Sequence, residues 1–302
     1  MATNYTDCLN WVMPDLPMEP ATTLVVNAIR DATIELCERS LCYRQELQQI
    51  LVLPPVDTTT TVAQVLGDSQ ITVADMTNFF VGDTLTVALA DTADQGAGSR
   101  WRGHVLTVAG TSGPGIITLD GQLPDAVNIG AAVTKLVYLY AITLPTGTAI
   151  AKGLFAWLND APIDPISQDD LDNEFNNTSF GWVGVNWRTD VNLPTRWYMP
   201  DDGTVGLLMP SNAAGNLRIL AALKPTRAST SFPTLLYERY IETIAHGAKA
   251  RIMLIPKKPY SDAQTGAWHQ QMFDGLVGEA RIRVARANTR GPLRTHTVFG
   301  LR

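Results

Sequence analysis

Residues 19–51 constrain the fold more than any other stretch, because their apolar side chains recur at the spacing of an α-helix. The repeat predicts one long amphipathic helix, with Pro20 in its first turn and Pro54-Pro55 beyond its far end. The apolar stripe comprises Val25, Ala28, Ile29, Ala32, Leu36 and Cys37. Arg30, Glu38, Arg39 and Gln45 fall on the other faces of the same predicted helix. Such a stripe needs partner elements from the rest of the chain.

Two further amphipathic helices are predicted near the C-terminus, at about 234–254 and 262–288. The first follows Ser231 and Pro233, and Ser261-Asp262 caps the second. Both carry an apolar face, so they are natural partners for the first helix. The sequence therefore predicts a three-helix core that is formed by the two ends of the chain.

Between these helices the sequence pattern changes from helical spacing to short runs that are typical of β-strands. Residues 56–137 are rich in Thr, Val, Gly and Asp, and turn sequences containing Gly or Pro separate the runs. The predicted strands are 70–73, 84–88, 104–108, 116–119 and 132–137. Because no helix intervenes, we expect a small all-β barrel or sandwich inserted into a host domain.

Residues 138–230 predict a small antiparallel sheet. Strands are expected at 135–144, 153–158, 196–199, 205–209 and 217–223, and Asp202-Gly203 has the composition of a hairpin turn. The predicted fold class is thus α+β. We expect a core of residues 1–55 and 138–302, the inserted domain at 56–137, and an extended C-terminal arm at 289–302.

The charge of the chain is unevenly distributed. The net charge is −6, yet residues 277–302 hold six arginines and one acid, so the rest of the chain is acidic. Arg283, Arg286 and Arg290 recur at i, i+3 and i+7 on one helical face. This basic face, which also includes Arg281, could be merely solvated, dock to an acidic protein surface, or line a passage for DNA.

Composition predicts an ordered globular protein, with 45% hydrophobic and 17% charged residues. No apolar run is long enough to cross a bilayer, and residues 1–10 lack the features of a secretory signal. We therefore expect a protein that is made in a cytosol-like compartment and does not contact a membrane. Cys8, Cys37 and Cys42 have no disulfide pattern and are interpreted as small apolar side chains.

Catalytic patterns are weak throughout. The carboxylates at Asp169, Asp170, Asp172 and Glu174 lack the glycine and spacing of a calcium loop, and helix N-terminal acids explain them better. The 110–113 run has the composition of a β-turn and lacks the spacing of a nucleophile elbow. The four histidines show no metal-ligand spacing, and Glu242 with His246 is interpreted as a surface i,i+4 pair. The sequence predicts no enzyme activity, no metal and no cofactor.

A tryptophan-rich stretch at 176–200 leaves three interpretations open. Its aromatic residues could fill the core of a small sheet, anchor a subunit interface, or form a sugar-binding platform. The residues are Trp182, Trp187 and Trp197, set among Asn, Gly and Pro.

The order of these segments resembles a known family. The residues that carry the likeness are 29–41, 170–172, 187–194, 197–210 and 240–254, with the runs IRDATIELCERSL, RWYMPDDGTVGLLMP and HGAKARIM among them. Together they resemble the head-to-tail adaptor, or connector, proteins of tailed double-stranded DNA bacteriophages. The likeness covers roughly 1–55 and 138–302.

This resemblance implies a structural virion protein of the neck. Copies of the adaptor, twelve in most such assemblies, would form a ring between the portal and the tail or nozzle proteins, surround the DNA exit channel, and contact packaged DNA without sequence specificity. The arm would dock to the portal through Arg290, Arg294, His296, Phe299, Leu301 and Arg302. Neighbouring copies would meet through Arg30, Glu38, Arg39, Gln45, Trp182 and Trp187.

An alternative function is a glycan-binding or receptor-binding module of a phage tail, which would use the tryptophan-rich sheet or the inserted domain. For the ring, we expect charge reversal at Arg30 and Arg39 together to spare the monomer fold and to weaken assembly.

Overall fold

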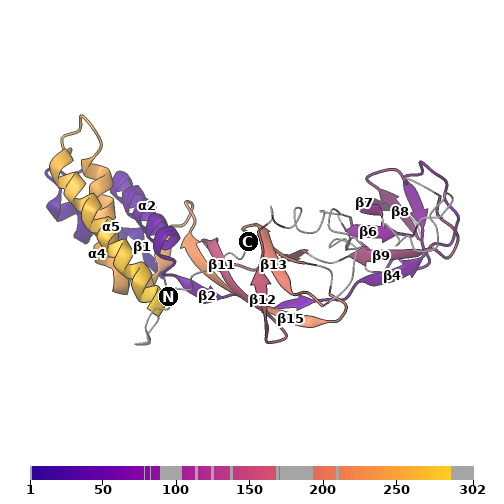
Figure 1. Cartoon of the computed structure of the whole chain (residues 1–302). Coiled ribbons are helices and arrows are strands. Elements are labelled where there is room, and N and C mark those ends of the chain that lie inside the picture. Colours follow the sequence, from indigo (N-terminus) through magenta and orange to yellow (C-terminus); the bar gives the residue numbers. More distant parts are fainter. Residues whose placement is uncertain are drawn as a thin grey trace, which may run out of the picture. The chain divides into compact units, whose positions relative to one another are not determined.

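The computed structural model describes most of the chain (Figure 1). The described residues are 2–77, 79–81, 83–88, 104–112, 115–123, 126–136, 139–167, 170, 193–208 and 211–286. They form a mixed α+β protein, as predicted, with four α-helices and several β-sheets in the described part. The chain divides into two compact units: one comprises 1–48, 143–154 and 219–302, and the other comprises 49–142 and 155–218.

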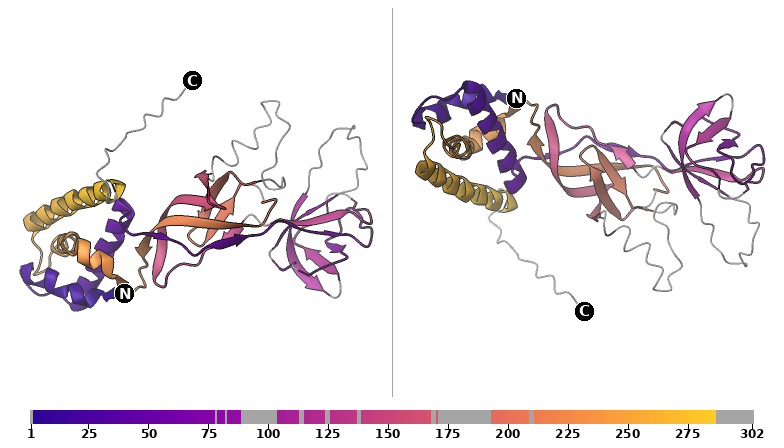
Figure 2. Two further views of the ribbon diagram at one scale, coloured as in Figure 1. Left: turned by 90° about the horizontal axis from the view of Figure 1, so that it is seen from below. Right: turned by 90° about the horizontal axis from the view of Figure 1, so that it is seen from above.

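The first unit, the helical unit, is built mainly from helices. A short strand pair, β1 (Ala2–Asn4) with β16 (Ser231–Pro233), brings the N-terminus to the start of a long helix. The helical segments are η1 (Tyr5–Cys8), α1 (Leu9–Val12), η2 (Met13–Asp15), α2 (Thr22–Ser40), α4 (Thr234–Met253) and α5 (Ala263–Arg286). Both views of Figure 2 show α4 enclosed by α5 on one side and by the N-terminal helical segments on the others.

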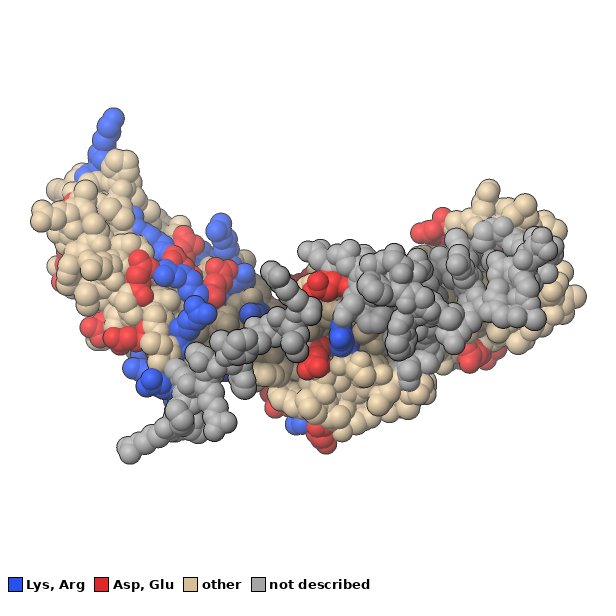
Figure 3. Space-filling view, in the orientation of Figure 1, with Lys and Arg blue, Asp and Glu red and all other residues tan. Residues whose placement is uncertain are grey.

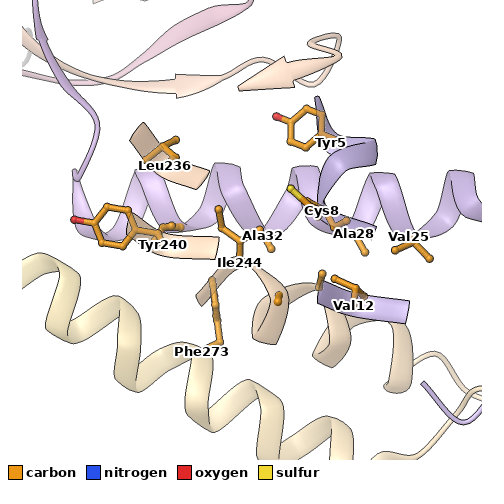
Figure 4. Close-up of a cluster of buried hydrophobic side chains, with 14 of the residues drawn as sticks. Tyr5, Cys8, Val12, Val25, Ala28, Ala32, Leu236, Tyr240, Ile244 and Phe273 are labelled. Atoms are coloured by element: carbon orange, nitrogen blue, oxygen red, sulfur yellow. The ribbon is translucent and has the colours of Figure 1, made fainter. Parts of the chain in front are cut away.

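One hydrophobic core joins these helices (Figure 4). All six residues of the predicted α2 stripe are buried in it, and they meet Leu236, Tyr240 and Ile244 from α4 and Phe273 from α5. Close approach is possible at Gly247, where an added Cβ would lie 2.8 Å from the Phe273 ring and 3.0 Å from the Ala32 Cβ. The absent side chain therefore sets the spacing of α2, α4 and α5.

The N-terminal turns are a further part of this core, and they were not expected from the sequence. Tyr5, Cys8 and Val12 are buried against α2 and α4. Their spacing of three and then four residues is helical, so the signal was present in the sequence, but it spans too few residues to stand out.

The predicted first helix is too long. Helix α2 ends at Ser40, and Leu41 takes a left-handed conformation at φ 53° while its N–H donates to the Cys37 carbonyl. The chain then enters β2 (Arg44–Glu46) and β3 (Ile50–Val52), which pair with β15 (Gly215–Pro225). Gln45 consequently lies on a strand. Pairing to a long, largely buried strand outweighs the helical spacing that continues in the local sequence.

An eight-stranded sheet has the order β10-β14-β13-β12-β11-β15-β2, with β3 also on β15. Its other strands are β10 (Leu139–Ala141), β11 (Thr148–Leu158), β12 (Ala161–Pro165), β13 (Arg196–Asp201) and β14 (Thr204–Leu207). The predicted hairpin at Asp202-Gly203 joins β13 to β14. The sheet is not purely antiparallel as expected, because β12 pairs parallel to β13.

The turn between β11 and β12 has an unusual backbone. Asn159 and Asp160 have φ of 49° and 65°, as a two-residue hairpin turn of mirror-image type requires. Asn and Asp tolerate this region because their short polar side chains bond locally. The Asn159 side chain bonds to another strand instead, where its oxygen accepts the N–H of Asn216 on β15 at 2.9 Å. No strand was expected from the sequence at β12.

A second sheet lies within the other unit, with the order β4-β9-β6-β7-β8-β5. Its strands are β4 (Val56–Thr59), β5 (Gln70–Thr72), β6 (Thr84–Val87), β7 (His104–Ser112), β8 (Ile116–Leu119) and β9 (Ala132–Leu136). An isolated bridge between Thr60 and Val73 links the ends of the two edge strands, so the sheet curls on itself. Leu85, Ile117 and Val133 are among its fully buried core residues.

Candidate assembly interface

Arg30, Glu38, Arg39 and Gln45, which are predicted to contact neighbouring copies, already have intrachain partners. Arg39 lies on the last turns of α2, where its Nη1 atom is 2.8 Å from Glu35 and 2.5 Å from Asp274 of α5. Its guanidinium also lies over the Phe273 ring at 5.8 Å. Arg251 of α4 pairs with the same Glu35 and lies 5.5 Å from the Phe273 ring centroid. Arg39 therefore ties α2 to α5 within one copy.

Glu38 and Gln45 are similarly engaged. The Glu38 carboxylate pairs with Lys224 of β15 at 2.8 Å. The Gln45 side-chain oxygen accepts the Tyr43 hydroxyl at 3.0 Å. The Glu38–Lys224 pair connects α2 to β15, whereas the Gln45 hydrogen bond is local. Both contacts leave part of each side chain at the surface.

Arg30 has a mixed environment. Its Nη1 donates to Asn27 at 3.2 Å, and its guanidinium lies 5.4 Å from the Tyr5 ring centroid. Its Nε is buried and has no hydrogen-bond partner among the described residues. The side chain is thus half-buried against the N-terminal turns. Burial raises the pKa of the Tyr5 hydroxyl well above its ordinary value, and Arg30 partly opposes that rise.

The predicted basic face lies on the last turns of α5. Arg281, Arg283 and Arg286 are all exposed. In Figure 3, Lys and Arg side chains intermingle with Asp and Glu on the visible face of the helical unit. Arg290 and the other arm residues (Arg294, His296, Phe299, Leu301, Arg302) lie outside the described residues, as do Trp182, Trp187 and most of the predicted acidic cluster.

A surface groove in the helical unit was not predicted. It has a volume of about 370 Å³ and lies between the N-terminal turns, α4 and the start of α5. Trp11 and Trp268 border it and are 47% and 52% exposed, respectively. The lining residues are Asn10, Trp11, Pro14, Asp15, Glu242, Ala245, His246, Lys249, Trp268 and His269.

Two histidines meet in this groove. The Nδ1 atoms of His246 and His269 are 2.7 Å apart, so one ring donates and the other accepts a single shared proton. The Trp268 ring stands edge-on to both imidazoles, with centroid separations of 5.6 Å and 4.8 Å. Burial lowers the pKa of both histidines, and Lys249 lowers them further. The pair is therefore held neutral at pH 7.

An ion pair lies beside the histidines. The Lys249 ammonium is almost fully buried and donates to the Asp15 carboxylate of η2. This hydrogen bond lowers the pKa of Asp15. Glu242 is exposed, lies one helical turn before His246, and makes no ion pair with any residue that the structure describes. With the histidines neutral, the groove carries one net negative charge.

Sequence spacing alone could not find this groove. His246 and His269 are separated by a helix end and a loop, and Trp11 comes from the other end of the chain. Among the groove residues, only Glu242 and His246 were recognised from the sequence as a pair, at i and i+4 on one helix. Within the described residues, no three His, Cys, Asp or Glu side chains are placed to hold a metal ion. No helix in the same residues is both long and apolar enough to span a membrane.

Comparison with known proteins gives one family match. The model of the SU10 adaptor protein family matches residues 125–296, which is more than half of the chain. This range includes most of the eight-stranded sheet and both C-terminal helices. The search of curated proteins finds no match.

One solved structure with local similarity is the Gp54 tailspike of Acinetobacter baumannii bacteriophage AP22 in complex with A. baumannii capsular saccharide. The identity is 16% and the TM-score 0.20, over 31% of this chain and 15% of the tailspike chain. A likeness this low supports no conclusion about fold or ligand. The family match includes four of the five segments that resemble head-to-tail adaptors, all but 29–41, and it covers the α4 and α5 walls of the groove. The chain belongs to the SU10 adaptor protein family and is a phage head-to-tail adaptor.

Proposed function

We propose that this chain forms a ring in the virion neck that joins the portal to the tail and surrounds the DNA exit channel. The observation that carries the proposal is the adaptor-family match over 125–296. Its partners are the portal protein, neighbouring adaptor copies (about twelve per ring, by the family resemblance) and tail or nozzle proteins. The chain acts by assembly and has no catalytic step.

The helical unit suits such a role physically. Its core includes contributions from both ends of the chain, and α2, α4 and α5 are cross-linked at the surface by the Arg39–Asp274 and Arg251–Glu35 pairs. A unit held together in this way can present charged side chains at fixed positions, which is what repeated contacts around a ring need. We propose that α2, α4 and α5 form the three-helix adaptor core.

The C-terminal segment supplies the portal contact in this proposal. Arg290, Arg294, His296, Phe299, Leu301 and Arg302 dock to the portal, while Arg281, Arg283 and Arg286 form a basic face on α5. The inserted strands 56–137 make contacts outside the portal interface, with a tail protein or a neighbouring copy. Any contact of the arginines with packaged DNA is non-specific.

Truncation after Asn288 tests the portal contact. The full-length chain and the truncated chain are each mixed with the portal protein and examined by native mass spectrometry and electron microscopy. We expect the full-length chain to form a ring on the portal, and the truncated chain to keep its circular dichroism spectrum but lose the complex. The matched control is the full-length chain with residues 289–302 in scrambled order, because it keeps the length and composition of the arm. A deletion of equal length from the inserted domain would keep neither.

The outcome is decisive in both directions. A full-length chain that forms no complex with the portal contradicts the proposed function. A truncated chain that docks normally would show that residues 289–302 are not part of the portal interface. Ring formation would then depend on the helical unit.

A further inference from the structure

The groove in the helical unit has the chemistry of a site for a guanidinium group. Trp11 and Trp268 are half-exposed at its border, and indole faces attract cations. Glu242 supplies a carboxylate without an ion-pair partner among the described residues, whereas Asp15 is already neutralised by Lys249. The groove is thus net negative and aromatic, a combination that favours arginine over any neutral or acidic side chain.

Helix α5 bears both this groove and exposed arginines. Trp268 and His269 line the groove from its first turns, and Arg283 and Arg286 lie on its last turns. Fifteen residues separate Trp268 from Arg283, which is about 22 Å along a helix. They lie within about 60° of each other around the helix axis. Because a straight helix holds them apart, the arginine of one copy cannot enter the groove of the same copy.

We propose that the groove of each copy receives the Arg283 side chain of a second copy. The guanidinium lies between the Trp11 and Trp268 rings and pairs with the Glu242 carboxylate. The contact is head-to-tail, because the two complementary surfaces are different parts of the protein. Repeated head-to-tail contacts generate a ring when the rotation between copies closes. The inference rests on the proposed ring and names the contact that would build it.

A charge swap tests this contact in the full-length chain. The variants are Glu242→Arg, Arg283→Glu and the double variant that carries both changes. Each is mixed with the portal protein, and the ring-bearing fraction is counted by electron microscopy and native mass spectrometry. We expect each single variant to lower that fraction by about tenfold, the effect of losing one buried cation contact. The double variant restores it, because every groove arginine then meets a glutamate.

Matched controls lie on α4, outside the groove. Glu238→Arg makes the same charge change as Glu242→Arg one turn earlier, and Arg239→Glu makes the same change as Arg283→Glu at another exposed arginine. Both should assemble like the wild type. Circular dichroism and thermal unfolding establish that every variant is folded before it enters the comparison.

The inference is overturned if either single variant assembles as the wild type does, or if the double variant remains defective. In both cases wild-type rings still form, and the proposed function stands without this contact. If the folded wild-type chain itself forms no ring with the portal, the ring proposal has failed and the groove contact fails with it.

Discussion

At the scale of single residues, Gly247 shows how a missing side chain organises the helical unit. Phe273 lies fully buried against it, with the guanidinium groups of Arg39 and Arg251 near its ring. The ring cannot move away without breaking these contacts. A glycine in a helix interior usually lowers stability relative to alanine by about 1 kcal/mol, so its presence here indicates a packing requirement.

We therefore expect Gly247→Ala to be destabilising. Overpacking costs about 1–3 kcal/mol and exceeds the gain in helix propensity of about 1 kcal/mol. Gly275 and Gly278 of α5 are the matched controls, because an added Cβ at either meets no atom within 4 Å. Gly275→Ala and Gly278→Ala should each stabilise by up to about 1 kcal/mol. Thermal unfolding followed by circular dichroism measures all three. A Gly247→Ala protein as stable as the controls would show that the helices can separate freely.

The histidine pair predicts a pH dependence. Both histidines have a pKa below the ordinary 6.5, first because of burial. The unfolded chain therefore binds protons that the folded chain does not, and stability is complete above 6.5 and falls as the pH drops below that value. The lowered pKa values of Asp15 and Asp274 act later, because stability held by carboxylates is lost toward and below their ordinary 3.8.

We expect the melting temperature of the helical unit to fall between about pH 7 and pH 5. Replacing both rings (His246→Gln with His269→Gln) should flatten the profile in this window, although the starting stability is lower. His104 and His296 are unchanged in both proteins. An equally steep profile in the double variant would assign the pH dependence to other groups.

At the scale of elements, the surface network between α2 and α5 changes what a mutation at Arg39 reports. Arg39 lies between Glu35 and Asp274, so charge reversal there would place three carboxylates together. The expectation that reversing Arg30 and Arg39 spares the monomer fold remains untested. The intrachain contacts of both residues nevertheless make that double variant a poor probe of assembly.

For Arg39→Glu alone we expect a loss of about 1–2 kcal/mol in the free energy of unfolding, because two partly exposed ion pairs are replaced by repulsion. Arg39→Glu with Asp274→Arg should recover part of that loss by restoring one pair in reverse. Asp31→Arg, an exposed charge reversal on the same helix, serves as the control and should change stability little. Equal stability of Arg39→Glu and the wild type in urea would mean that the network contributes nothing.

The end of α2 offers a second prediction at this scale. Leu41 is held at φ 53° and ψ 36°, a left-handed conformation that costs a non-glycine residue about 1–2 kcal/mol. Glycine is the usual residue at this position. Leu41→Gly should therefore stabilise the protein by up to about 1 kcal/mol, whereas Leu24→Gly, within the helix, should destabilise it by about that amount. Thermal unfolding compares the two, and a destabilised Leu41→Gly protein would show that the leucine side chain contributes more than the strain costs.

At the scale of the whole molecule, the curled sheet has a core of its own and a narrow connection to the chain. Val56 of β4 and Lys135 of β9 are directly paired, so the two ends of the insert meet at one point. An insertion with adjacent ends can be removed without stretching the surrounding chain.

We predict that residues 57–134 can be replaced by Asn-Gly, because a two-residue turn of this composition closes an antiparallel pair. The shortened protein should keep the helical unfolding transition to within about 0.5 kcal/mol. Far-UV circular dichroism and limited proteolysis would measure this, with the full-length chain as reference. Loss of the helical transition would show that the inserted sheet stabilises the helical unit.

The sequence by itself determined the helix at 22–40 in outline, both C-terminal helices and the strands of the inserted sheet other than β4. In each of these, the periodicity of apolar side chains and the flanking Gly, Pro, Ser or Asp act locally, and tertiary contacts reinforce them. Ser261-Asp262 shows this directly, since the Asp262 carboxylate accepts the Gln264 and Thr265 N–H groups at the start of α5.

Tertiary structure alone decided where α2 stops, the pairing of β12, and the groove. Residues 43–47 keep helical spacing but bond to β15, because an unpaired buried strand edge costs more than a lost helical turn. Trp11, Glu242 and His269 come from three separate segments, so no local pattern could bring them together. Helical and strand signals are local and additive, whereas a site depends on which faces long-range packing places opposite each other.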